Sequence, residues 1–141
     1  MVLKELESKR FKYIRIELAG IYAVASRLCS EGYLAIPVPS GHFPEIDVIV
    51  QDIEKKKYTG IQVKSLGSDK PKYYFPPKYP HPTIFVKGIE KGPLEVYVHD
   101  LSSINEIIKE MESRPIRRRF IIKDRVEIPE KREKWDDIFK S

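Results

Sequence analysis

A carboxylate, an amide and an amine are spaced along two neighbouring apolar segments, residues 45–52 and 58–65. Asp47 stands on the first segment, and Gln62 and Lys64 stand two positions apart on the second. Strand side chains alternate in direction, so Gln62 and Lys64 point to one face, and pairing the segments as a hairpin brings Asp47 beside them. Carboxylate and amide oxygens suit a hard cation, and the amine can orient or deprotonate a water. This set is suited to metal-assisted hydrolysis of a phosphodiester.

A solvated polar face is the alternative, because an Asp and a Gln-x-Lys triplet occur on many strands. Two features favour chemistry. The chain has only two glutamines, and one of them is Gln62. Ile61 and Val63, which alternate with Gln62 and Lys64, are apolar. A polar trio on the inner part of a sheet needs partners, and a bound cation would supply one.

The elements that position these residues follow from hydrophobic periodicity. Residues 10–30 repeat apolar side chains every three or four positions, which predicts a helix that Gly32 ends. Ser103 and Glu106 have the spacing of a capping box and open a second predicted helix that runs to about residue 113. Apolar runs predict strands over residues 33–38, 45–52, 58–65, 83–89, 94–99 and 119–126.

The remaining segments complete one domain. Residues 66–82 hold five prolines and are predicted to form a long loop. Trp135, Ile138 and Phe139 are expected to anchor the C-terminal segment on the body. The order α-β-β-β-β-β-α-β over residues 1–141 predicts a single domain of the α/β (α+β) class, a central mixed sheet flanked by helices.

Composition bounds the function. The chain has 141 residues and a net charge of +5, so it is one domain of modest basic excess. Its one cysteine, Cys29, excludes a disulfide framework and a multi-cysteine zinc site and is expected in the core. The chain has neither an apolar run of membrane-spanning length nor a secretion signal, so we expect a cytoplasmic protein. Scarce Gln and Asn beside abundant Lys, Glu and Ile resemble a thermophile's composition.

The basic surplus is concentrated in two blocks. Residues 54–91 hold nine lysines and three acids, and residues 114–141 hold ten basic residues and six acids. Lysines interleaved with aromatic residues are suited to binding the phosphates and bases of nucleic acid. The alternative is an ordinary solvent-exposed charged surface. The candidate nucleic-acid contacts are Lys55, Lys56, Lys57, Lys70, Lys72, Lys78, Arg117, Arg118 and Arg119.

The segment GHFPEIDVIV, followed by a turn and YTGIQVKS, resembles the PD-(D/E)XK nuclease superfamily. Pro44 to Asp47 stand for the PD portion, stretched by two residues, and residues 62–64 stand for (D/E)XK with Gln in place of the acid. This variant resembles Mrr-type restriction enzymes and small PD-(D/E)XK homing endonucleases. The succession of helix, Gly, aromatic residue and strand resembles the opening of archaeal Holliday-junction resolvases. The resemblance covers residues 10–66 and implies a restriction-endonuclease-like core.

The resemblance also implies roles. Asp47 would be the central metal ligand, Gln62 the second and the Val63 backbone carbonyl a third, while Lys64 would serve the attacking water. Glu17 is the candidate for the acid that the family often carries on its first helix. Resolvase-like members place that acid where Ile21 stands, one turn later on the same face. A long Pro-rich loop also follows the third strand, where many relatives carry a helix.

These observations predict a metal-dependent DNA endonuclease that uses Mg²⁺ or Mn²⁺ and no organic cofactor. A homodimer is expected, because one small site cuts one strand and a duplex needs two sites. The DNA substrate stays open, with a Holliday-junction-like or other structure-specific substrate among the alternatives. Two rival functions also stay open: a nucleic-acid-binding protein of the same fold with impaired chemistry, and an interaction protein that binds no DNA.

Overall fold

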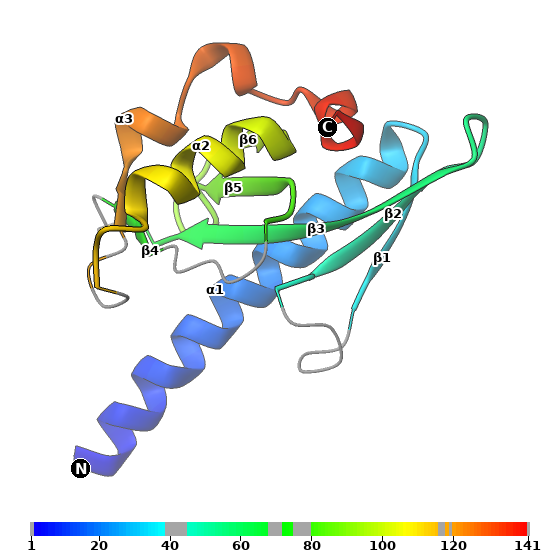
Figure 1. Cartoon of the computed structure of the whole chain (residues 1–141). Helices are drawn as coiled ribbons and strands as arrows, with labels where there is room; N and C mark the ends of the chain where they lie inside the picture. The colour runs from blue at the N-terminus through cyan, green and yellow to red at the C-terminus, as the bar shows by residue number, and fades with distance from the viewer. Residues whose placement is uncertain are drawn as a thin grey trace.

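A computed structural model describes residues 2–38, 45–67, 72–74, 80–115, 118 and 120–140, with side chains except at 2–7, 72–74, 120, 122 and 123. Figure 1 shows the arrangement of the elements. In chain order they are α1 (Val2–Ser30), β1 (Leu34–Pro37), β2 (Val48–Asp52), β3 (Lys57–Leu66), β4 (Lys72–Tyr74), β5 (Thr83–Lys87), β6 (Glu95–His99), α2 (Leu101–Met111), β7 (Phe120–Ile122), α3 (Lys123–Val126) and the 3₁₀ turns η2 (Pro129–Lys131) and η3 (Trp135–Phe139).

The main sheet has five strands in the order β1-β2-β3-β5-β6. Its pairs are antiparallel except β3 and β5, which run parallel. The sheet is therefore mixed, and the predicted coarse class, α+β with helices beside a mixed sheet, is confirmed. The finer order differs, because β4 and β7 form a separate antiparallel pair and α3 occupies the second half of the strand predicted over residues 119–126.

Strand β3 changes partner halfway along its length. Its first half pairs with β2, and this ladder ends at the pair Val48–Ile61. Its second half pairs with β5 on the opposite edge, beginning at Gln62 and Thr83. Among the residues that the structure describes, no ladder on the β2 side of β3 extends past Ile61, and the residues predicted to do chemistry begin at Gln62.

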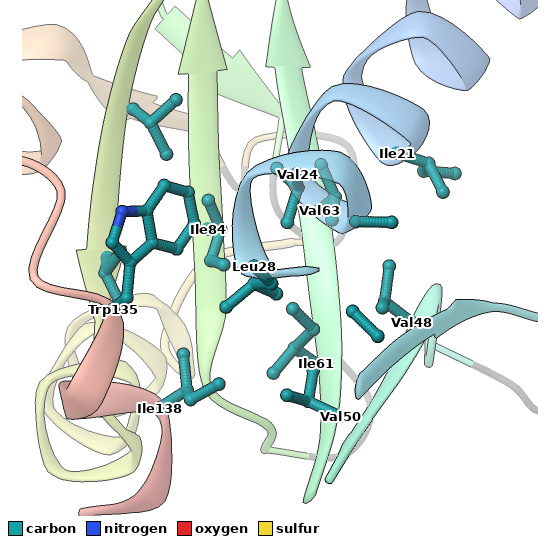
Figure 2. Close-up of a cluster of buried hydrophobic side chains, with 14 of the residues drawn as sticks. Ile21, Val24, Leu28, Val48, Val50, Ile61, Val63, Ile84, Trp135 and Ile138 are labelled. Carbon is teal, nitrogen blue, oxygen red and sulfur yellow. The ribbon is translucent and has the colours of Figure 1, made fainter. Parts of the chain in front are cut away.

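Helix α1 covers one face of the sheet through a buried apolar cluster (Figure 2). Val24 and Leu28 of the helix lie against Ile61 and Val63 of β3 in this cluster. The periodicity that predicted the helix is confirmed, and the helix begins earlier than residue 10. Trp135 and Ile138 of η3 join the same cluster, and Phe139 packs against it, so the predicted anchoring of the C-terminal segment is confirmed.

Helix α2 covers the opposite face, where Ile104 and Ile107 pack with Phe85 and Tyr97. The helix begins three residues before the predicted capping box, because Asp100 is its N-cap and accepts the Ser103 backbone N–H at 2.8 Å. The Ser103 hydroxyl is instead 2.8 Å from Nδ1 of the buried His99. The capping box at Ser103 was therefore a wrong prediction of the helix start.

Two further observations concern the helices. Cys29 is exposed rather than in the core, and its Sγ lies 3.7 Å from Ala35 O of β1. None of the helices in the described part of the chain combines the length and apolar character needed to cross a bilayer.

Gly20 sets how closely α1 approaches β3, which gives the first prediction. A Cβ at this position would lie 1.9 Å from Ser65 Oγ and 3.3 Å from Ile89 Cδ1. Alanine favours a helix interior over glycine by about 1 kcal/mol, yet we expect Gly20→Ala to lower the free energy of unfolding by about 1–3 kcal/mol through overpacking. Urea unfolding measures the change.

The matched control is Gly20→Ala in a Ser65→Ala background, where the Oγ contact is absent. The loss should then be smaller than in the wild-type background. An equal or larger loss in both backgrounds would contradict the close approach at Ser65.

Candidate functional site

Asp47 is fixed where β2 separates from β3. It directly precedes β2, its N–H donates to Ile61 O at 2.8 Å and its carbonyl accepts the Val38 N–H at 2.9 Å. Its carboxylate Oδ2 accepts the backbone N–H of Val63 at 2.8 Å. Three hydrogen bonds thus hold both the backbone and the carboxylate of Asp47 on the hairpin.

The bond from Val63 follows from the change of partner in β3. The Gln62 N–H points to β5, where it donates to Pro82 O, so the next N–H, that of Val63, points to the β2 side. No ladder pair with β2 extends past Ile61, and a buried N–H needs an acceptor. The Asp47 carboxylate is that acceptor.

Lys64 lies on the same face of β3 as Gln62, the predicted amide ligand. Val63 packs in the cluster under α1 and Leu66 in the cluster under α2. Because strand side chains alternate, Gln62 and Lys64 share the α2 face with Leu66. Gln62 is 7% exposed and lies one residue past the Val48–Ile61 pair that ends the β2–β3 ladder.

Burial disfavours charge on both ionisable groups. Desolvation raises the pKa of the Asp47 carboxyl, and the Val63 N–H and the charge of Lys64 partly oppose this. Desolvation lowers the pKa of the Lys64 amine, and attraction to Asp47, Glu17 and Glu45 partly opposes it. The two groups therefore lie within electrostatic reach of each other, as the hairpin pairing predicts.

Glu17 approaches the site from α1. Its side chain is exposed, and it is among the charges that attract Lys64. Gly20, one turn later, packs against Ser65, the residue after Lys64, and this contact holds α1 beside the strand. Ile21 is buried in the core cluster instead, so an acid at that position would face apolar side chains.

Glu45 lies in the segment that resembles the nuclease motif, but it was not predicted to belong to the site. Its backbone has φ 63°, a left-handed conformation uncommon outside glycine, and its carboxylate attracts Lys64. The available signal was its spacing, two residues before Asp47. Asp47, Glu17 and Glu45 together act on one ammonium.

The donor set around Asp47 consists of hard oxygen atoms. Across the residues that the structure describes, no three His, Cys, Asp or Glu side chains form a group that could hold a metal ion. The predicted ligands are different: one carboxylate, the Gln62 amide oxygen and the Val63 carbonyl. The N–H and C=O of a strand residue are directed to the same edge, so the Val63 carbonyl is directed toward the Asp47 side. These donors fit Mg²⁺, which binds through few protein oxygens and keeps several waters.

The predicted nucleic-acid contacts lie in different places. Lys55 and Lys56 are exposed in the turn between β2 and β3, and Lys57 is exposed at the start of β3. Arg118 is exposed, whereas Lys72 lies on β4 with its side chain outside the described set. Lys70, Lys78, Arg117 and Arg119 lie outside the described residues.

Comparisons of the chain with protein-family models, with curated proteins and with solved structures find no match. The resemblance to PD-(D/E)XK nucleases therefore rests on the residues quoted from the sequence, and family membership stays a prediction.

The electrostatics of Asp47 generate a second prediction. Because the folded-state pKa of this carboxyl is raised, the unfolded state ionises first as pH rises past about 3.9. As pH rises from the pKa of the unfolded state to that of the folded state, the free energy of unfolding therefore falls. Asp47→Asn keeps an acceptor for the Val63 N–H and removes the buried charge. We expect it to raise the Tm by a few degrees (about 2–5 °C) at neutral pH.

Thermal unfolding from pH 3 to 7 measures the effect, with Glu54→Gln at an exposed position of the β2–β3 turn as the control. The difference in Tm between Asp47→Asn and the wild type should increase with pH, and the difference for the control variant should not. A Tm lower than that of the wild type at neutral pH would mean that the Asp47 charge stabilises the fold, which contradicts the prediction.

Proposed function

We propose that this chain is a metal-dependent DNA endonuclease that hydrolyses phosphodiester bonds with Mg²⁺ or Mn²⁺. The observation that carries the proposal is that Asp47, directly before β2, and Lys64, on β3, lie within electrostatic reach of each other, and burial shifts the pKa of each against its charge. Perturbed groups of opposite sign gathered on one part of a sheet mark candidate sites of chemistry.

The carboxylate supports a cation at this place. The Asp47 carboxylate is desolvated, and its hydrogen bond from the Val63 N–H fixes its direction. The neutral oxygens of Gln62 and Val63 would complete the protein ligands without adding charge. A bound divalent ion would supply Lewis acidity at the scissile phosphate and lower the pKa of a bound water.

Lys64 supplies the proton chemistry. Burial lowers the pKa of its amine, so the neutral form, which can accept a proton at Nζ from the attacking water, is easier to reach. Water oxygen bonds to phosphorus as its proton moves to Lys64, and the bond from phosphorus to one ester oxygen breaks. That oxygen leaves as an alcohol with a proton from solvent, and Lys64 returns the accepted proton to solvent. Glu17 and Glu45 limit the lowering of the Lys64 pKa, and so help set its proton affinity.

The finer architecture and the assembly are part of the same proposal. A restriction-endonuclease-like core is supported by a helix packed on the β2–β3 hairpin that carries Asp47, Gln62 and Lys64. A homodimer is proposed because both strands of a duplex can be cut only by two such sites.

The proposal predicts the effect of removing each group. Asp47→Ala should abolish nicking of a supercoiled plasmid in Mg²⁺ or Mn²⁺, because the metal loses its charged ligand. Lys64→Ala should lower the rate about 10²–10⁴-fold, the usual size of a proton-transfer contribution. DNA affinity, measured by fluorescence anisotropy, should change little in either variant.

Lys134→Ala, at an exposed position before η3, is the matched control and should cleave as the wild type does. Asp47→Ala protein that cleaves at the wild-type rate, after contaminating nucleases are excluded, would refute the site. Salt-dependent binding without cleavage would favour the impaired DNA-binding protein instead. Absence of any DNA binding at low salt would favour the interaction protein.

Gln62 can be tested separately. Gln62→Glu adds a second carboxylate beside Asp47, so we expect tighter Mg²⁺ binding, measured as a larger metal-induced rise in Tm, with some activity retained. The Asp47→Asn protein, which lacks the charged ligand, should show a much smaller rise. An unchanged Mg²⁺ affinity in Gln62→Glu would remove Gln62 from the ligand set.

A further inference from the structure

The turn between β2 and β3 is a basic projection of the molecule. The hairpin extends beyond the body at the end far from β4 (Figure 1). Three consecutive lysines, Lys55, Lys56 and Lys57, are exposed there, and Glu54 is the one acid among residues 53–58. We call residues 53–58 the basic turn.

The basic turn has a defined conformation. The Asp52 carboxylate accepts the backbone N–H of Lys55 at 3.2 Å, and Lys56 has φ 52°, which closes the turn. An Asp side chain that bonds the backbone ahead of it is a recognised turn device. The lysines are therefore presented by an organised turn, which lowers the entropy lost when they bind a ligand.

Apolar side chains stand beside these charges. Tyr58 is 69% exposed and Ile53 is 61% exposed. The Tyr58 hydroxyl accepts a hydrogen bond from Gln51 Nε2 at 3.0 Å, which orients a ring that is left open to solvent. Cationic groups around an exposed ring suit a ligand with phosphates and flat or apolar surfaces, as DNA has.

The same two strands connect the basic turn to Asp47. Five antiparallel pairs run without a break from Val48–Ile61 to Asp52–Lys57, and β1 pairs along the other edge of β2. Asp47 and Lys55 are eight residues apart, which at ~3.3 Å per strand residue gives a separation of at most about 26 Å. A three-stranded segment holds this spacing more firmly than an isolated hairpin would.

We propose that the basic turn binds the backbone of duplex DNA within about eight base pairs of the phosphate held at Asp47. The distance follows from ~3.4 Å of helix axis per base pair. This inference rests on the proposed endonuclease function and adds a second contact at a fixed separation. The hairpin then positions the duplex on one side of the cut.

Tethered cleavage tests the separation. In a Cys29→Ser background, which removes the one native cysteine, Lys56→Cys carries an iron–EDTA reagent that cuts nearby DNA. We expect these cuts to one side of the nick that the Cys29→Ser protein makes, and within about eight base pairs of it. Ser26→Cys, exposed on α1, is the control and should not cut at that position.

The outcomes separate the inference from the proposed function. Nicking by the Cys29→Ser protein without cuts at that distance from residue 56 would overturn the inference alone. Tethered cuts at the nick itself would also overturn it, because the turn would then lie at the site. Absence of nicking and of DNA binding by the Cys29→Ser and wild-type proteins would overturn the proposed function, and the inference with it.

Charge reversal tests the contact energetically. Lys55→Glu with Lys57→Glu should lower affinity for a 25-base-pair duplex and reduce the slope of log affinity against log salt by about 2, measured in EDTA to prevent cleavage. The matched control is Lys109→Glu with Lys134→Glu, two exposed lysines on α2 and before η3. Equal losses in the two double variants would overturn the inference, whereas a loss confined to the turn variant supports it.

Discussion

The structure depends on the point at which β3 exchanges one partner for another. Up to Ile61 the strand pairs with β2, and from Gln62 it pairs with β5. Between these ladders the Val63 N–H is directed to the β2 side, beyond the last described pair with β2, and the Asp47 carboxylate accepts it. Because the buried Val63 N–H needs an acceptor, the Asp47 carboxylate is held beside Val63, the residue before Lys64.

This arrangement carries an energetic cost. Asp47 and Lys64 are both partly removed from water, and the pKa of each moves against its charged form. Glu17 and Glu45 place further negative charge around one ammonium, an excess that a cation would balance. Groups arranged against stability are typical of sites where chemistry is performed. The core on both sides of the sheet, under α1 and under α2, supplies the compensating burial.

The sequence determined the elements whose side chains repeat with a clear period. Helix α1, the strands of the main sheet and the anchoring by Trp135 all followed from apolar spacing. Strand β4 was missed, because it has three residues and its partner β7 is distant in the chain. Strand β7 lies in the first half of the strand predicted over residues 119–126, and α3 occupies the second half. The start of α2 was misplaced because two neighbouring residues can cap it, and Ser103 is engaged by His99, a contact that exists only in the folded chain.

The candidate site divides in the same way. Alternation along one strand was enough to place Gln62 with Lys64, and the apolar context of the hairpin was enough to bring Asp47 near them. Only the tertiary structure decided that Glu17 of α1 lies within electrostatic range of Lys64. Gly20 packs against Ser65, Ile21 is buried in the core cluster and Glu17 stays exposed. The tertiary structure also decided that Glu45 lies within electrostatic range of Lys64. Glu45 has a left-handed conformation and precedes β2, so no periodic pattern in the sequence marks it. Such features depend on packing between segments far apart in the chain, which no local pattern encodes.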